Sequence, residues 1–168
     1  MKSLSSPERS GEMDMPEVSS QMIEVCPFRI RGDRPEFLLI RRAPGESLYP
    51  GLWQFVTGRV EKGEKASAAA LRELREETGA AAVRFWVVPA VDSFYDPRED
   101  RIALVPIFAA QIDPGFDLRL SAEHGEYEWL AYDGAARRLV WPGQRNCLDI
   151  VQRYIVGGEE AGTLLRIS

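Results

Sequence analysis

The chain has 168 residues, which is enough for one domain with a sizeable hydrophobic core. Hydrophobic residues make up 45% of the sequence and charged residues 28%, as in ordinary soluble globular proteins. The net charge of −5 argues against a protein that binds nucleic acid or anionic membranes, because both need a basic surface. No apolar run is long enough to span a bilayer, and the N-terminus lacks the apolar stretch of a secretory signal. We expect a cytoplasmic monomer or homodimer that binds neither nucleic acid nor a membrane.

The first third of the chain is predicted to form a tail and three strands. Residues 1–20 are polar and aperiodic, which is typical of a flexible tail. Arg34-Pro35 is expected in a turn between the first two strands, and residues 43–51, with two prolines and two glycines, in a loop. Apolar runs predict the strands at 22–31, 36–42 and 53–56.

The remaining sequence predicts helices and strands in turn. Residues 66–78 are rich in strong helix formers, and residues 143–156 carry apolar side chains at helical spacing. Strands before and after one helix, followed by a second helix, favour a single α/β or α+β domain with a mixed sheet covered on both faces. Strands are expected at 83–91, 101–112 and 127–130. The polar stretch 92–100 is expected to connect the first two of these strands, and residues 157–168 to form a loosely ordered end.

The two cysteines, Cys26 and Cys147, are far apart in the sequence. Their spacing matches no metal-binding pattern. We interpret them as buried free thiols in a reducing compartment.

The stretch from Gly58 to Gly79 carries an unusual combination of charges and glycines. Gly58 is followed after five residues by Glu64, and after seven more by Arg72-Glu-Leu-Arg-Glu-Glu-Thr-Gly79. Gly79 is placed to end the helix in a left-handed cap. Three carboxylates, those of Glu73, Glu76 and Glu77, fall at i, i+3 and i+4 and therefore share one helix face.

These carboxylates favour a metal site. Glu73 and Glu77 are like charges at i,i+4, a pair that destabilises a helix unless a cation offsets the repulsion. Oxygen ligands favour Mg²⁺, which Mn²⁺ can replace, over zinc. Glu76 and Glu77 are the first candidates for ligands, and Glu73 is either a further ligand or the base. A Glu/Arg-rich helix is ordinarily only a salt-bridged surface, and the correctly spaced glycines and Glu64 are what favour function here.

This stretch resembles the signature of the Nudix hydrolases, enzymes that cleave nucleoside diphosphates linked to another group. Only Ala80 departs from it, at a position where the family usually has a bulky aliphatic residue. The resemblance covers roughly residues 21–156 and implies an α/β/α sandwich with a mixed β-sheet, leaving 157–168 as a C-terminal extension. It also implies that the Gly58 carbonyl reaches the metal and that Arg72 braces the loop through Glu64. Because neighbours at i,i+1 do not face each other on a helix, Glu73 is a less obvious partner of Arg72.

A second acidic region precedes the last predicted strand. Many Nudix enzymes carry a glutamate there that completes the metal site or acts as the base. Glu123 is our candidate, with Glu126 and Glu128 as competitors, and the alternative is that all three are surface acids. His124, the only histidine, has a pKa range suited to proton transfer, although a single loop histidine is more often structural.

Candidates for substrate binding are arginines and aromatic residues near the signature. Arg41 and Arg42 end a strand and must point to opposite faces, so we expect one of them to contact phosphate. Arg59 is a further candidate, and surface charges are the alternative for all three. Trp53 adjoins the signature loop and is the most suggestive residue for stacking on a base. Weaker stacking candidates are Phe28, Phe55 and Tyr95, whereas Trp86, Trp129 and Trp141 are assigned to packing.

A finer resemblance points to one branch of the family, the bacterial dihydroneopterin triphosphate pyrophosphatases, which also act on dATP. The residues that carry it are Trp53-Gln-x-Val-Thr-Gly58, Glu123-His124, Tyr127-x-Trp129-Leu130, and Trp141 followed by Arg145-Asn146. It implies Mg²⁺-dependent hydrolysis of a nucleoside or pterin triphosphate with release of pyrophosphate, and it makes Glu123 a metal ligand. The alternatives are a dinucleoside polyphosphate or nucleotide-sugar hydrolase and a non-catalytic nucleotide sensor. RNA decapping is disfavoured by the acidic composition.

Overall fold

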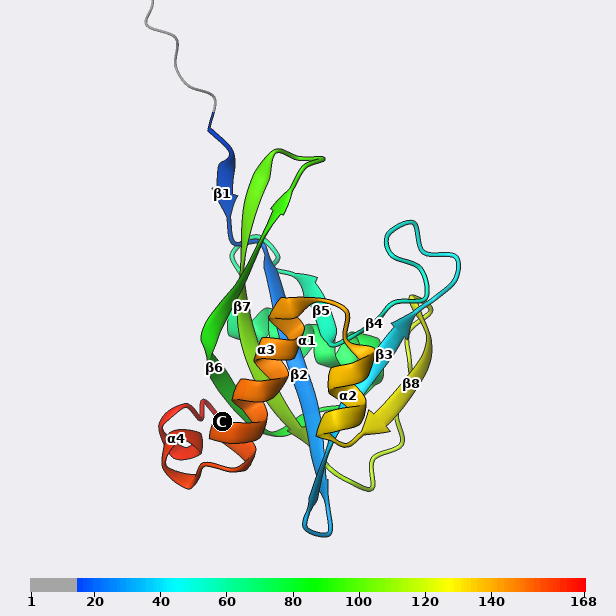
Figure 1. The fold of residues 1–168 in the computed structure, drawn as a ribbon, viewed down its shortest axis with the longest axis vertical. Helices are drawn as coiled ribbons and strands as arrows, with labels where there is room; N and C mark the ends of the chain where they lie inside the picture. The colour runs from blue at the N-terminus through cyan, green and yellow to red at the C-terminus, as the bar shows by residue number, and fades with distance from the viewer. Residues whose placement is uncertain (1–14) are drawn as a thin grey trace, which may run out of the picture.

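The computed structural model describes residues 15–168, which form a mixed β-sheet between two layers of helices (Figure 1). The sheet order is β1-β7-β2-β3-β4, with β5 paired to β2, β6 to β7 and β8 to β3. The strands are β1 (Glu17–Ser19), β2 (Met22–Arg31), β3 (Arg34–Arg42), β4 (Trp53–Gln54), β5 (Val56–Arg59), β6 (Ala82–Asp96), β7 (Arg101–Ile112) and β8 (His124–Leu130).

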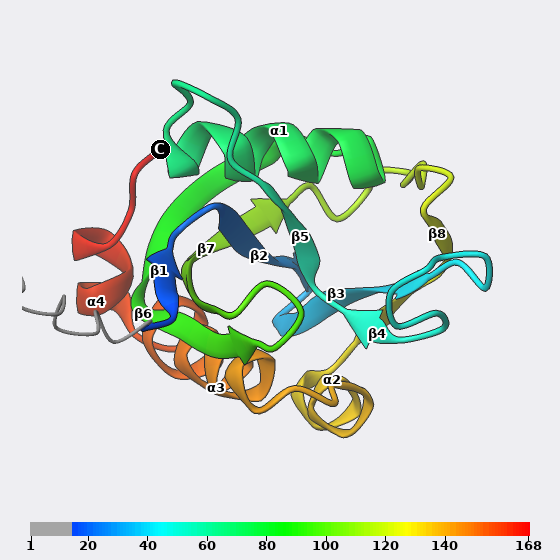
Figure 2. The same cartoon turned by 90° about the horizontal axis from the view of Figure 1, so that it is seen from above.

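Helices cover both faces of this sheet. Seen from above, α1 lies on one side, and α2 and α3 lie on the other (Figure 2). The expected α/β/α sandwich is thus confirmed. The helical elements are α1 (Ala66–Thr78), α2 (Tyr132–Arg138), α3 (Pro142–Ile150), the π-helical turn η1 (Val151–Val156) and α4 (Glu159–Leu164). None of the described helices is long and apolar enough to cross a membrane.

The hydrophobic core is divided by the sheet into two clusters. Alternate residues of β2 point to opposite faces, so Val25 packs on the α1 side, while Cys26 and Phe28 pack on the α3 side. Leu74 anchors α1 in the first cluster, and Cys147 anchors α3 in the second. Both cysteines are buried and free, as expected.

One strand segment changes partner close to the predicted site. The first part, β4, pairs with β3, and the second part, β5, pairs with β2. The single residue between them is Phe55, which is fully buried. β5 and β3 therefore both lie along the same strand, β2, and a gap opens between them beyond Phe55.

The strand β2 and the helix α1 have the predicted bounds, but several connections differ. Arg34 and Pro35 belong to β3 and pair with β2, so they are not in the turn. The turn lies at Gly32, whose φ of 63° is the left-handed conformation that glycine adopts without strain. Residues 92–96, expected in a connection, continue β6 because their backbone pairs with β7 as far as Asp96.

Both ends of the described chain are more ordered than predicted. Glu17–Ser19, inside the expected tail, pair in parallel with β7, whereas residues 1–14 lie outside the described residues. The expected loose end is held against β6. The indole N–H of Trp86 donates to the Gly162 carbonyl at 2.7 Å, and the Phe85 backbone bonds to Ile167 and Ser168. The predicted helix over 143–156 is α3 followed by the π-helical turn.

Candidate active site

One pocket collects most of the predicted site residues. It lies where β5, α1 and the segment leading into β8 meet, at the gap beyond Phe55. Three of the four carboxylates proposed as ligands line it, together with the signature glycine. The lining consists of Met22, Arg42, Thr57, Gly58, Arg59, Glu73, Glu77 and Glu123.

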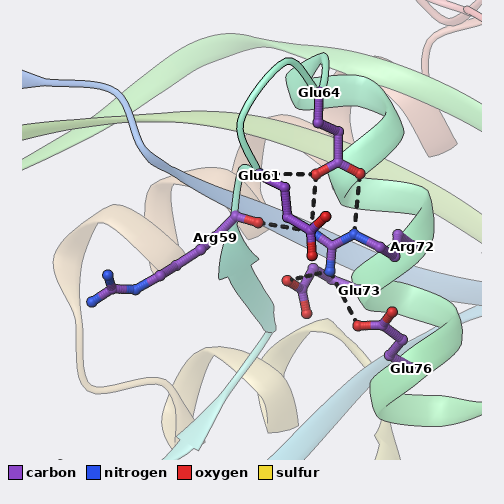
Figure 3. Close-up of polar contacts among 6 residues, drawn as sticks. All are labelled: Arg59, Glu61, Glu64, Arg72, Glu73 and Glu76. Atoms are coloured by element: carbon purple, nitrogen blue, oxygen red, sulfur yellow. Dashed lines mark hydrogen bonds and ion pairs between the residues drawn. The ribbon is translucent and has the colours of Figure 1, made fainter.

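Arg72 organises the signature loop beside this pocket (Figure 3). Its Nε and Nη2 donate to the two oxygens of Glu64 at 3.1 and 3.0 Å, and Nη2 also donates to the Arg59 carbonyl at 2.8 Å. Its Nη1 donates to Glu73 at 2.8 Å and to Glu76 at 3.1 Å. The expected contact with Glu64 is confirmed, and the prediction that Glu73 is a less obvious partner is wrong. All the N–H groups of the guanidinium are used, and its pKa is raised, chiefly by Glu64.

Glycine at position 58 is required by a close approach of the helix. A Cβ at Gly58 would lie 2.1 Å from the Cγ and Cδ atoms of Glu73, far inside contact distance. The carboxylate of Glu73 therefore passes directly over the backbone of β5. This packing sets the Gly58 backbone and the Glu73 side chain side by side in the pocket lining.

Glu77 is the most buried carboxylate of the helix, with 6% of its surface exposed. Burial, together with the negative charges of Glu73 and Glu123, raises its pKa to about 9. Its Oε2 atom has no hydrogen-bond partner in the described structure. A buried, unsatisfied carboxylate oxygen beside two more acids is an environment that a cation would stabilise.

The three glutamates of the second acidic region have different surroundings. Glu126 bonds to Arg41 at 3.2 Å and Glu128 to Arg138 at 2.9 Å, so neither reaches the pocket. Glu123 lines the pocket, which favours it over both competitors. His124 is buried beside it, and burial lowers its pKa to about 4. The ring is therefore neutral, and its 3.9 Å approach to Glu77 is not an ion pair.

The predicted substrate-binding residues fall into two groups. Arg42 and Arg59 line the pocket, and the Arg42 guanidinium is held there by the Leu48 carbonyl at 2.7 Å. Arg41 points away and bonds to the Gly51 carbonyl at 3.0 Å. Trp53 packs against the α3-side cluster, with the Arg138 guanidinium 4.9 Å from its ring centre, so it does not line this pocket.

Glu76 is the one predicted metal ligand that the structure leaves outside the pocket lining. Its side chain is 59% exposed and bonds to Arg72. Thr57 and Met22 line the pocket although the sequence did not single them out as site residues. The signal for Thr57 was its place immediately before Gly58, and for Met22 none was present.

A buried polar pair on the opposite face of the sheet was also missed. Glu24 and Gln144 are 3% and 4% exposed, and the Gln144 amide donates to Glu24 at 2.9 Å. Burial raises the pKa of Glu24 to about 7, partly opposed by this hydrogen bond. The available signal was a glutamate within the otherwise apolar run Met22-Ile-Glu-Val-Cys26.

The donors present suit a hard divalent cation. They are carboxylates and a backbone carbonyl, the oxygen ligands that Mg²⁺ and Mn²⁺ accept. The unsatisfied Glu77 oxygen and the close approach at Gly58 are consistent with such a site. Among residues 15–168, no group of three His, Cys, Asp or Glu side chains is already placed to hold a metal ion, and Arg72 donates hydrogen bonds to both Glu73 and Glu76.

Comparison with known proteins identifies the family. The NUDIX domain model matches residues 22–149, most of the chain. The chain belongs to the Nudix family. Over 130 residues it is 35% identical to an octanoyltransferase from Myxococcus xanthus, covering 73% of this chain but only about a third (34%) of that relative. The family assignment therefore concerns the domain, because the chain spans only about a third of the length of this relative.

Two further comparisons cover most of the other protein. The nucleoside triphosphatase NudI from Salmonella arizonae is 28% identical over 113 residues, which are 63% of this chain and 79% of NudI. The structure of the E. coli dihydroneopterin triphosphate pyrophosphohydrolase superposes with a TM-score of 0.62 at 22% identity. The superposition covers 80% of this chain and 94% of the E. coli protein, and it shows a shared fold.

Proposed function

We propose that this Nudix protein is a Mg²⁺-dependent pyrophosphohydrolase that acts on a nucleoside or pterin triphosphate and releases pyrophosphate. The observation that carries the proposal is the convergence of Gly58, Glu73, Glu77 and Glu123 on one pocket. The substrate class is supported by the names of two similar proteins, a nucleoside triphosphatase and a dihydroneopterin triphosphate pyrophosphohydrolase. Mn²⁺ is expected to replace Mg²⁺, since both accept carboxylate oxygens.

The carboxylates of α1 divide into different roles in this proposal. Glu77, Glu73, Glu123 and the Gly58 carbonyl would hold the cation, and Glu76, which bonds to Arg72, is the remaining candidate ligand. When bound, the cation neutralises charge on the phosphate oxygens and lowers the pKa of water. Glu64 and Arg72 hold the loop against the helix, and Gly79 ends the helix with a φ of 73°.

Glu123 is the better candidate for the base. The Glu73 carboxylate already accepts a hydrogen bond from Arg72, whereas no hydrogen bond or ion pair holds the Glu123 carboxylate within residues 15–168. One oxygen of Glu123 would therefore be able to bind the cation while the other accepts a proton from the water that attacks phosphorus. Arg42 and Arg59 provide the positive charge of the pocket and are proposed to bind phosphate oxygens.

A substrate screen with Mg²⁺ tests the proposal by scoring pyrophosphate against monophosphate release. The panel holds dihydroneopterin triphosphate, the deoxynucleoside triphosphates, diadenosine polyphosphates and ADP-ribose. Pyrophosphate release from a triphosphate, well above the other substrates, is the expected result. A preference for a dinucleotide or a nucleotide sugar would overturn the substrate class and retain the metal site. Binding without turnover of any compound would favour the nucleotide-sensing alternative.

Substitution of Glu77 by Gln tests the catalytic site itself. We expect loss of metal-dependent turnover in a folded protein, because the amide removes the charge and keeps the shape. Glu126→Gln is the matched control, since Glu126 bonds to Arg41 outside the pocket. Equal turnover in the wild type and Glu77→Gln would contradict the assignment of Glu77.

A further inference from the structure

Two buried atoms without hydrogen-bond partners face each other at the edge of the pocket. They are the Glu77 Oε2 atom and the His124 Nε2 atom, both unsatisfied in the described structure. They lie 3.9 Å apart, and the two residues are only 6% and 5% exposed. A buried donor or acceptor without a partner is unfavourable, and a movement of about 1 Å would bring the pair into hydrogen-bond range.

The position of His124 depends on an irregularity in the strand. In the pairing of β3 with β8, Arg41 lies opposite Glu126, but Arg42 lies opposite His124, so Gly125 is an extra residue. In a regular strand His124 and Glu126 would point to the same face, away from α1. The bulge reverses the direction of His124 and places it on the α1 side, next to Glu77.

We propose that His124 is a positioning residue, whose Nε2–H donates to Glu77 Oε2 and so orients the carboxylate toward the cation. The inference rests on the proposed function, because it assumes that Glu77 is a ligand. Partners of this kind fix the orientation of metal-ligating side chains, and their loss typically weakens metal binding by about 10- to 100-fold. The other ring nitrogen, Nδ1, is 3.4 Å from the Ser121 hydroxyl oxygen, so in this tautomer the Ser121 O–H can donate to Nδ1.

NMR of the wild-type protein gives the direct test, because His124 is the only histidine in the sequence. After removal of any affinity tag, ¹⁵N-histidine spectra report which ring nitrogen carries the proton. The expected result is the Nε2–H form, with a change in the Nε2 signals on addition of Mg²⁺. A ring protonated only at Nδ1 in the presence of Mg²⁺ would overturn the inference.

Variants of His124 test the same contact through Mn²⁺ affinity, measured by electron paramagnetic resonance of the free ion. His124→Gln keeps a donor near the Nε2 position, and we expect affinity close to that of the wild type. His124→Asn and His124→Leu lack this donor, and we expect binding to be about 10- to 100-fold weaker. Turnover of the Leu variant should recover at high Mn²⁺, as expected for a positioning residue. Equal affinity in the Gln and Leu variants would contradict the inference.

Failure of the inference and failure of the proposed function give different results. A wild-type protein that binds no Mn²⁺ would overturn the metal site and the inference with it. A wild type that binds Mn²⁺ and turns over substrate, with variants that bind equally well, would overturn the role of His124 alone. If the Leu variant does not fold, the NMR spectra of the wild type still decide the protonation of Nε2.

Discussion

Arg72 and Glu64 are joined by two nearly parallel hydrogen bonds of 3.1 and 3.0 Å, between the Nε and Nη2 atoms and the two carboxylate oxygens. Glu64 lies in the loop and Arg72 in the helix, so this pair fixes one to the other. The backbone N–H of Glu61 also donates to Glu64 at 3.0 Å. Both contacts lower the pKa of Glu64 and keep it ionised. The loop is thus shaped by a charge pair that stands beside the pocket.

Replacing Arg72 by Lys should lower turnover by about 10- to 100-fold while the protein stays folded. An ammonium has three donors on one atom and cannot span the two oxygens of Glu64 and the Arg59 carbonyl together. The measurement is kcat/KM with saturating Mg²⁺. Arg75→Lys on an exposed position of the same helix is the control and should leave turnover unchanged. Wild-type activity in the Arg72 variant would mean that the loop holds its shape without the guanidinium.

Gly58→Ala is expected to reduce turnover by about 100-fold or more, because the new methyl group displaces Glu73 from its place over β5. Gly58 does not have a positive φ, so the backbone itself accepts alanine. The thermal midpoint should therefore change far less than the activity. Gly45→Ala is the matched control, since its added methyl meets no atom within 4 Å. Retained activity in Gly58→Ala would contradict the close packing of Glu73.

Glu24 should make the protein less stable as the pH rises. Its pKa in the folded state is about 7, above the ordinary value of 4.5, so the unfolded chain releases the proton first. The contribution of Glu24 to the free energy of unfolding is fully present below pH 4.5 and is lost as the pH rises from 4.5 to 7. At about 1.4 kcal/mol per pKa unit, the change is about 3 kcal/mol. The measurement is the free energy of unfolding in urea across this range.

Glu24→Gln isolates this contribution from that of Glu77, whose raised pKa acts in the same direction. The amide remains neutral, and it keeps an acceptor for the Gln144 amide. We expect the pH dependence of the variant to be smaller by about 3 kcal/mol and its stability at pH 8 to be higher than that of the wild type. If the free energies of unfolding of the two proteins changed with pH in parallel, the pKa of Glu24 would be the same in the folded and unfolded states, which would contradict the prediction.

Removal of residues 157–168 should destabilise the protein by roughly 3 kcal/mol and promote self-association. The lost contacts are the Trp86–Gly162 hydrogen bond and the backbone bonds that Phe85 and Val87 make to residues 165–168. They cover the outer edge of β6, and an open edge is a template for pairing with another chain. Thermal unfolding and light scattering give the two readouts. A monomer with an unchanged midpoint would show that this segment contributes no stability.

The helix, the loop and their cap were predictable because their signals are local. Gly79, Glu64 and Arg72 lie within one short stretch. The cap at Gly79 was predicted from the helix pattern, and the contact of Arg72 with Glu64 from the family resemblance. In the sequence, only the family resemblance favoured Glu123 over Glu126 and Glu128 as the glutamate of the site. The structure separates them through long-range ion pairs, with partners on β3 and α2.

Features that depend on distant partners were not predictable from local pattern. The apolar run around Glu24 signals that this residue is buried, but nothing in the sequence identifies Gln144, 120 residues away, as its partner. The bulge at Gly125 depends on how β8 pairs with β3, so the sequence alone does not predict to which face of the sheet His124 points. The C-terminal segment was expected to be loosely ordered, but its backbone forms hydrogen bonds with the backbone of β6.

The change of partner at Phe55 has a consequence for the pocket. The Gly58 side of the pocket belongs to the β2–β5 pair, while the Glu123 side is attached to β3 through the hydrogen bond from the Ala43 N–H to the Glu123 carbonyl at 2.8 Å. No ladder of backbone hydrogen bonds joins β5 to β3. The two walls are therefore held by separate strand pairings, and the chain passes from one pairing to the other at the buried Phe55.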